Sequence, residues 1–318
     1  MNLYKDKLEK LLDEKEVGKI LEKNADDIFG GPVKILSVKI KPFKTYLDSN
    51  SYSLAALYEI QTDVSGNIMS EKLFASAHST PAKEQDYKAL QKLSFLSKNP
   101  APNLEIPKSR HFIKSFGLLL RDYVAGDLLK DKLDDNFIKK SALALAEFQK
   151  INIFLDFVFE LRSNYSDLEK NVEIIEKRGD PASNLIQEDF KDINVQLESL
   201  VDAEKHDEKV LSHGDFTPTN IIITPDIKIS LIDFGSIGYR HRLWDVAGFC
   251  SHIKTTKDSQ IDGAVRTQIQ NLFLKTYSEA TGISFGEKEK RLLKTYGAYF
   301  ELLIRTHVLV WNTATPFL

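Results

Sequence analysis

The stretch HGDFTPTN occupies residues 213–220, and the tripeptide DFG follows at residues 233–235. Between these motifs, Ile221–Ile223 and Lys228–Ile232 are short runs rich in β-branched residues, separated by a Thr-Pro-Asp turn. This pattern predicts a β-hairpin. Two antiparallel strands joined by a tight turn start and finish at the same edge of the sheet. The hairpin would bring the end of the first motif, Asn220, next to the start of the second, Asp233.

The two motifs contain the residue types that phosphoryl transfer requires. This reaction needs a carboxylate at the attacking hydroxyl and oxygen ligands that hold Mg²⁺ on the nucleotide phosphates. Asp215, Asn220 and Asp233 supply these groups, and one Asn and one Asp completed by water and phosphate oxygens suffice for Mg²⁺. Each motif alone has a simpler explanation, a turn with a buried Phe or a tight turn around an Asp. Their combination favours a kinase-like site.

The two motifs resemble the catalytic loop and the metal-binding motif of the aminoglycoside phosphotransferase and choline kinase family. The resemblance implies ATP or GTP as co-substrate, Asp215 as the catalytic base or hydroxyl-orienting residue, and Asn220 and Asp233 as Mg²⁺ ligands. It also implies that His213 supports the catalytic loop. Trp244-Asp245-Val246-Ala247 resembles the helix that follows in the family, whose Asp braces the loop, so Asp245 is expected to be structural.

The resemblance extends to the stretch Leu120–Gly126, where the family's two lobes hinge and backbone groups meet adenine. Asp122 and Val124 fit these backbone contacts, although a plain linker after a buried strand explains the stretch almost as well. The connection from Asp233 to Asp245 lacks the long activation segment and the Ala-Pro-Glu motif of protein kinases. A small hydroxyl-bearing acceptor is therefore favoured over a protein.

The resemblance implies an α+β, bilobal protein-kinase-like fold, and the pattern in the rest of the chain agrees with two lobes. A helical lead-in over residues 3–28 precedes strands of alternating pattern, a hairpin turn at residues 64–67 and one long amphipathic helix after Pro81. Beyond Gly126 the pattern is helical almost throughout. We therefore expect a small N-terminal lobe with an antiparallel sheet over residues 1–122, and a larger, mainly helical lobe over residues 123–318.

The nucleotide side of the predicted site departs from the family. Relatives place a Lys on the third strand, but here the expected position falls near Ala75 or Ser76, and Lys72 is the nearest candidate to contact phosphate. An exposed Lys at the end of a strand is the simpler interpretation of Lys72. The acidic partner on the next helix could be Glu84 or Asp86, and the loop over residues 45–53 contains no glycine to approach phosphate closely.

These departures keep a second hypothesis open, a kinase-shaped pseudoenzyme that binds a ligand or regulates without catalysis. A protein kinase or a lipopolysaccharide-core kinase is a third hypothesis. The size of its acceptor would depend on the helical insert around residues 155–205.

Composition excludes several other classes. The chain has 318 residues, 42% of them apolar, and 43 Lys and Arg against 46 Asp and Glu. It therefore has no basic surplus for nucleic acid. Cys250 is the only cysteine, which excludes an intramolecular disulfide and is typical of a reducing compartment. With no apolar run typical of a signal peptide or a membrane span, we expect a cytoplasmic protein. The sequence leaves the oligomeric state open.

Overall fold

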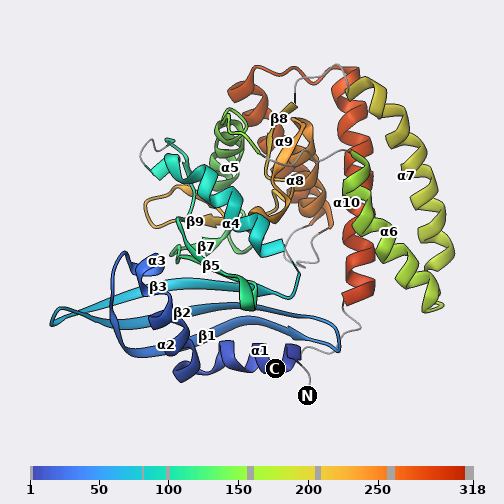
Figure 1. The fold of residues 1–318 in the computed structure, drawn as a ribbon. Helices are drawn as coiled ribbons and strands as arrows, with labels where there is room; N and C mark the ends of the chain where they lie inside the picture. The colour runs from blue at the N-terminus through green and yellow to red at the C-terminus, as the bar shows by residue number, and fades with distance from the viewer. Residues whose placement is uncertain are drawn as a thin grey trace. The chain divides into compact units, whose positions relative to one another are not determined.

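The computed structural model describes residues 3–80, 82–97, 101–155, 161–204, 209–255 and 262–311 (Figure 1). These residues form two compact units. The first comprises the described parts of Met1–Asn99 and Ile106–Ala125, and the second those of Pro100–Glu105 and Gly126–Thr315. Among the described residues, no helix combines the length and the apolar character needed to span a lipid bilayer.

The first unit is built on an antiparallel sheet, as predicted. Its strand order is β1-β2-β3-β6-β5. The predicted turn at residues 64–67 is confirmed: Val64 pairs with Asn67, and Ser65 and Gly66 both have positive φ, 53° and 86°. Such turns follow the right-handed twist of the strands they join. The strands are β1 (Lys34–Leu47), β2 (Tyr52–Val64), β3 (Asn67–His78), β5 (Ser109–Ile113) and β6 (Leu118–Asp122).

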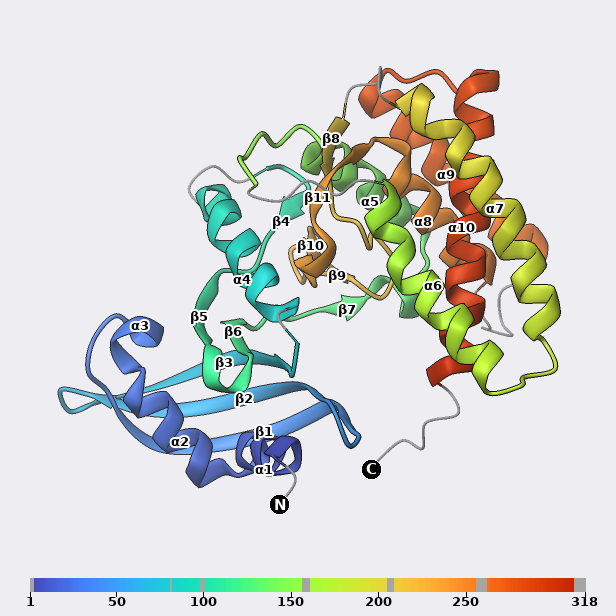
Figure 2. The same cartoon turned by 45° about the vertical axis from the view of Figure 1, so that its right-hand side comes forward.

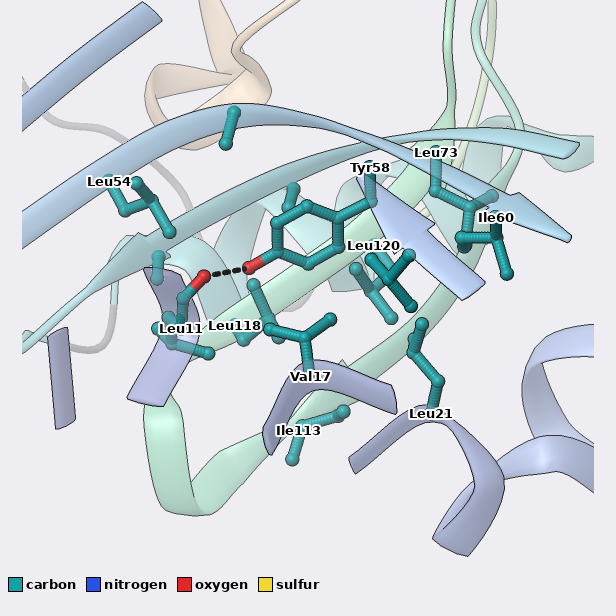
Figure 3. Close-up of a cluster of buried hydrophobic side chains, with 14 of the residues drawn as sticks. Leu11, Val17, Leu21, Leu54, Tyr58, Ile60, Leu73, Ile113, Leu118 and Leu120 are labelled. Carbon is teal, nitrogen blue, oxygen red and sulfur yellow. Dashed lines mark hydrogen bonds between the residues drawn. The ribbon is translucent and has the colours of Figure 1, made fainter. Parts of the chain in front are cut away.

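Three short helices cover one face of this sheet. They are α1 (Leu3–Leu12), α2 (Glu14–Lys23) and α3 (Ala25–Phe29). Their apolar faces and the inward side chains of the strands form a single core, part of which is drawn in Figure 3. Inside this core the Tyr58 hydroxyl donates a hydrogen bond of 2.8 Å to the carbonyl of Leu11, and burial raises the pKa of Tyr58. The helical lead-in is thus a cover for the sheet.

The opposite face of the sheet packs in part against α4 (Ala82–Leu93). The rings of Tyr87 and Phe112 stack with centroids 5.9 Å apart, and Gln91 Nε2 donates to Ser109 Oγ at 2.9 Å. This is the predicted amphipathic helix, and it ends in a short 3₁₀ turn over Ser94–Ser97.

The second unit is mainly helical and contains two small sheets. In Figures 1 and 2, α6, α7 and α10 run side by side, and α8 packs between α10 and α9. The rings of Phe249 and Phe273 stack at 4.0 Å between α8 and α9. The helices are α5 (Asp135–Phe148), α6 (Leu161–Lys177), α7 (Ser183–Glu204), α8 (Leu243–Thr255), α9 (Gly263–Thr281) and α10 (Glu287–Trp311).

The two small sheets carry the sequence motifs. One has the order β4-β10-β9-β7, and the other pairs β11 with β8. The strands are β4 (Leu104–Glu105), β7 (Asp127–Leu128), β8 (Lys209–Ser212), β9 (Ile221–Ile223), β10 (Ile229–Leu231) and β11 (Gly238–His241).

Candidate active site

The β9–β10 hairpin holds Asn220 and the start of the DFG motif at one edge. Ile221 pairs with Leu231 and Ile223 with Ile229, and the N–H of Ile232 donates to the carbonyl of Asn220 at 3.1 Å. These four paired side chains are buried, so the hairpin is fixed by its own core. The hairpin predicted from the two β-branched runs is confirmed.

Asp215 and Asn220 are joined directly. Asn220 Nδ2 donates to Asp215 Oδ2 at 2.7 Å and to the Asp215 carbonyl at 3.0 Å. Because a carboxylate accepts hydrogen bonds, the amide must present its nitrogen to Asp215, which leaves Asn220 Oδ1 for another partner. Burial raises the pKa of the Asp215 carboxyl, and the negative charge of nearby Asp233 raises it further, while His213 opposes this shift. The three predicted residues therefore lie together.

Asp233 itself lies in an uncommon backbone conformation. Its φ and ψ are 65° and 72°, in the left-handed region that Asp tolerates better than most residues. The residue is exposed, whereas the next one, Phe234, is fully buried with its ring 4.9 Å from that of His213. The buried Phe anchors the turn and leaves the carboxylate of Asp233 at the surface of the site.

Gly214 brings the two motifs into backbone contact. Its φ is +83°, and a Cβ at this position would lie 2.0 Å from the carbonyl oxygen of Ser236. Only glycine avoids this clash with main-chain atoms. On either side of the contact, Ser212 in β8 pairs with Gly238 in β11. The loop that carries Asp215 is therefore held against the turn that carries Asp233.

Asp245 holds the same loop from the first turn of α8. Its two carboxylate oxygens accept the N–H groups of His213 and Gly214, both at 2.9 Å, and the residue is 1% exposed. Arg240, also buried, is the nearby positive charge. Burial lowers the pKa of Arg240 to about 10, and the charge of Asp245 acts in the opposite direction. These contacts favour a structural role for Asp245, which stays a prediction.

His213 connects the loop to the hairpin. It is completely buried, and its Nε2 donates to the carbonyl of Ile232 at 3.0 Å. With the backbone N–H held by Asp245 and the ring held at the end of β10, the side chain positions the residues on both sides of it. The supporting role of His213 stays a prediction with this geometry in its favour.

The oxygen atoms at the hairpin edge suit Mg²⁺. Asn220 Oδ1 and the Asp233 carboxylate are hard donors, and the neighbouring Asp215 adds negative charge that a divalent cation would offset. Within the described ranges, no group of three or more His, Cys, Asp or Glu side chains could hold a metal ion. Two protein ligands fit an ion that also binds phosphate oxygens, so Asn220 and Asp233 would hold it only together with a nucleotide.

Comparison with known proteins decides the family. The family model described as "Phosphotransferase enzyme family" matches residues 58–282, more than two thirds of the chain. The chain belongs to this family. No curated protein matches the sequence.

Solved structures agree with this assignment of the fold. Choline kinase LicA from Streptococcus pneumoniae is 16% identical, with 94% of this chain and 97% of that chain covered and a TM-score of 0.58. Amicoumacin kinase hAmiN, in complex with AMP-PNP, Ca²⁺ and Ami, is 12% identical, with coverages of 91% and 85% and a TM-score of 0.60. A thermostable mutant of aminoglycoside phosphotransferase APH(4)-Ia, in a ternary complex with ADP and hygromycin B, is 13% identical, with 92% of each chain covered and a TM-score of 0.57. The α+β, protein-kinase-like fold is confirmed.

The predicted nucleotide-binding residues of this phosphotransferase lie in or next to β3 and β6 of the first unit. Lys72 is 57% exposed and pairs with Glu59 on β2, Nζ to Oε1, at 2.9 Å. The Asp122 carboxylate accepts a hydrogen bond from Arg110 Nε, and its N–H donates to the carbonyl of Lys108 at 2.9 Å. In the part of the chain that the structure describes, the backbone of Val124 makes no hydrogen bond to another backbone group. The roles of Lys72, Asp122 and Val124 stay predictions.

Two features of the first unit were not predicted from the sequence. Arg121 is 5% exposed, and its guanidinium lies 4.5 Å from the ring of Phe74, its register partner on β3. In the turn between β1 and β2, the Asp48 carboxylate accepts the N–H groups of Asn50 and Ser51 at 2.7 and 2.6 Å. Two backbone N–H groups of the turn are thus already hydrogen-bonded to a side chain of the same turn. An Arg next to the apolar run Leu118–Leu120 was the available signal for the first feature.

A cavity of about 530 Å³ adjoins the loop of residues 213–220 in this phosphotransferase. Pro218 and Thr219, which lie between Asp215 and Asn220, form part of its wall, and α10 and the end of α8 form much of the rest. His252 of α8 also lines it, and burial lowers the pKa of this imidazole to about 4. The cavity therefore contains a neutral His at physiological pH.

The pKa of His252 predicts a loss of stability in acid. The unfolded chain protonates this His near pH 6.5 and the folded protein only near pH 4, so its stabilising contribution is complete above pH 6.5 and is lost as the pH falls toward 4. We expect His252 to lower the free energy of unfolding by about 2 kcal/mol between pH 7 and about pH 5. Urea unfolding of the wild type and of His252→Gln at both pH values measures this. An equal fall in both proteins would contradict the prediction.

Proposed function

We propose that this phosphotransferase moves the γ-phosphoryl group of ATP or GTP, with Mg²⁺, to a hydroxyl group of a small molecule. The observation that carries the proposal is the cluster of Asp215, Asn220 and Asp233, joined by the hydrogen bonds of Asn220 to Asp215 and fixed by the β9–β10 hairpin. A carboxylate next to two oxygen ligands for a hard cation is what phosphoryl transfer to an alcohol requires.

Each residue of the cluster has a defined task in this reaction. The Asp215 carboxylate accepts a hydrogen bond from the acceptor hydroxyl, orients its oxygen toward the γ-phosphorus and takes up the proton as the oxygen–phosphorus bond forms. Asn220 holds Asp215 Oδ2 at 2.7 Å, which leaves its Oδ1 for Mg²⁺. Asp233 supplies the second protein oxygen. When bound, Mg²⁺ would neutralise phosphate charge. The leaving group is the nucleoside diphosphate.

Replacing Asp233 by Ala tests the ligand assignment. We expect the affinity for ATP in the presence of Mg²⁺ to fall at least about tenfold, because the ion loses one of two protein ligands. Titration calorimetry with and without Mg²⁺ measures this. Asp226→Ala is the matched control, since Asp226 is an exposed carboxylate at the opposite end of the same hairpin. Unchanged Mg²⁺-dependent affinity in Asp233→Ala would refute the assignment.

The enzymatic activity itself is tested by release of ADP from Mg·ATP in the presence of a panel of small alcohols. Acceptor-dependent release that disappears in Asp215→Ala supports the proposed function. Absence of release across the panel, with nucleotide bound, would favour the other hypothesis.

A kinase-shaped binding protein is the second candidate function. Two observations favour it: Lys72 is occupied by Glu59, and Asp48 occupies two amides of the β1–β2 turn. Both features reduce the groups that these elements offer to a triphosphate. Ligand binding without turnover would distinguish this function from catalysis.

A further inference from the structure

The cavity next to the catalytic loop has walls that select for a class of acceptor. It lies within the second unit, and most of the residues that line it are apolar. Ile253, Ile304, Val308 and Leu309 form an aliphatic wall from α8 and α10. A molecule with a hydrocarbon body would bury that body here and gain roughly 25 cal/mol for each Å² removed from water.

The charged side chains that line the cavity among the described residues are all cationic. Among the described residues that line it, none is Asp or Glu, while two are cationic, Lys130 and Arg305. Arg305 is balanced by Asp189, with Nη1 and Oδ2 2.8 Å apart. Lys130 has no ion-pair partner among the described residues, and its backbone N–H donates to the carbonyl of Pro218 at 3.1 Å. The backbone of Lys130, whose ammonium group has no ion-pair partner among the described residues, is thus hydrogen-bonded to the catalytic loop.

From these walls and charges we infer that the acceptor is an amphipathic alcohol with an apolar body and an anionic group such as a carboxylate, which Lys130 binds. The inference rests on the proposed function, because it assigns this cavity to the acceptor. A cationic acceptor would lose water against an aliphatic wall and meet Lys130 with no carboxylate in the described lining to compensate. An anionic acceptor gains a charge-assisted hydrogen bond at the same place.

Three probes of equal chain length and different end groups test the inference. They are 8-hydroxyoctanoate, 1,8-octanediol and 8-amino-1-octanol, titrated calorimetrically into the full chain without nucleotide. We expect the hydroxy acid to bind tightest and the amino alcohol weakest, with a difference of about tenfold between them. Tightest binding of the amino alcohol, or no binding of any probe, would overturn the inference.

Charge reversal at Lys130 tests whether this residue causes the preference for the hydroxy acid. Lys130→Glu should remove the preference for the hydroxy acid, and Lys130→Gln should reduce it by about half on a logarithmic scale. Lys132→Glu is the matched control, because Lys132 is exposed, pairs with Asp127 at 2.6 Å and does not line the cavity. It should keep the wild-type order of affinities. An unchanged preference in Lys130→Glu would also overturn the inference.

Phosphoryl transfer separates this inference from the proposed function. If the wild type binds the hydroxy acid through Lys130 but transfers phosphate to no alcohol, the ligand class stands and the proposed function fails. If it phosphorylates the amino alcohol in preference to the hydroxy acid, the proposed function stands and the ligand class is wrong.

Discussion

Replacing Asp215 by Ala is expected to lower turnover by about two to four orders of magnitude, which is the usual contribution of a positioned acid–base group. The variant loses the carboxylate that we propose meets the acceptor hydroxyl, and also the partner of Asn220 Nδ2. The nucleotide should still bind, because Asn220 and Asp233 keep their oxygen atoms. Release of ADP in the presence of an accepted alcohol measures turnover, and calorimetry measures the affinity for Mg·ATP.

Asp226→Ala controls for the loss of a carboxylate near the hairpin, and it should keep wild-type turnover. Asp215→Asn tests the chemistry more finely, since an amide keeps the size of the side chain but accepts protons poorly. Both Asp215 variants should be impaired. Full turnover in either would remove Asp215 from the reaction and leave the loop without a base.

The largest expected effect on stability comes from Asp245→Ala. The substitution leaves the buried N–H groups of His213 and Gly214 without their acceptors and removes the negative charge near buried Arg240. Leaving a buried N–H group without its acceptor costs about 1–3 kcal/mol, so the loss of two acceptors and of the nearby opposite charge should cost about 3–5 kcal/mol. Urea unfolding of the two proteins at pH 7 measures the difference in free energy of unfolding.

Two further variants keep this prediction testable if Asp245→Ala does not fold. Asp245→Asn retains one acceptor oxygen and should lose less stability, and Arg240→Met removes the nearby positive charge. In a double-mutant cycle of Asp245→Asn and Arg240→Met, the two losses should not add, because the two opposite charges interact inside the protein. Additive losses would show that the two charges do not interact, and a cost below about 1 kcal/mol for Asp245→Ala would contradict the support of the loop by Asp245.

The site was predictable where its geometry is local. The Asp215, Asn220 and Asp233 cluster follows from one short loop and one hairpin, whose β-branched runs and turn are visible in the sequence. The same holds for the sheet of the first unit, whose alternating strands and turn at residues 64–67 are confirmed. Such patterns depend on neighbours along the chain, and a single sequence contains them.

Other features depend on contacts between distant segments. Arg121 stacks on Phe74 only because β6 pairs with β3 in one particular register, and alternation does not fix that register. The sequence shows that the β1–β2 turn contains no glycine, but it does not show that the Asp48 carboxylate binds two backbone N–H groups of that turn. The cavity is assembled from α7, α8, α10 and the catalytic loop, so its aliphatic wall and its charges had no signature in any one stretch.

The hairpin between Asn220 and Asp233 has an exposed tip and mostly buried strands. Its closed end, at Pro225, Asp226 and Ile227, is exposed, while the paired isoleucines and Leu231 in between are buried. Residues added to or removed from that tip should leave the spacing of the two proposed Mg²⁺ ligands, Asn220 and Asp233, unchanged. The tip is thus a place where this enzyme can be lengthened, labelled or tethered without disturbing its chemistry.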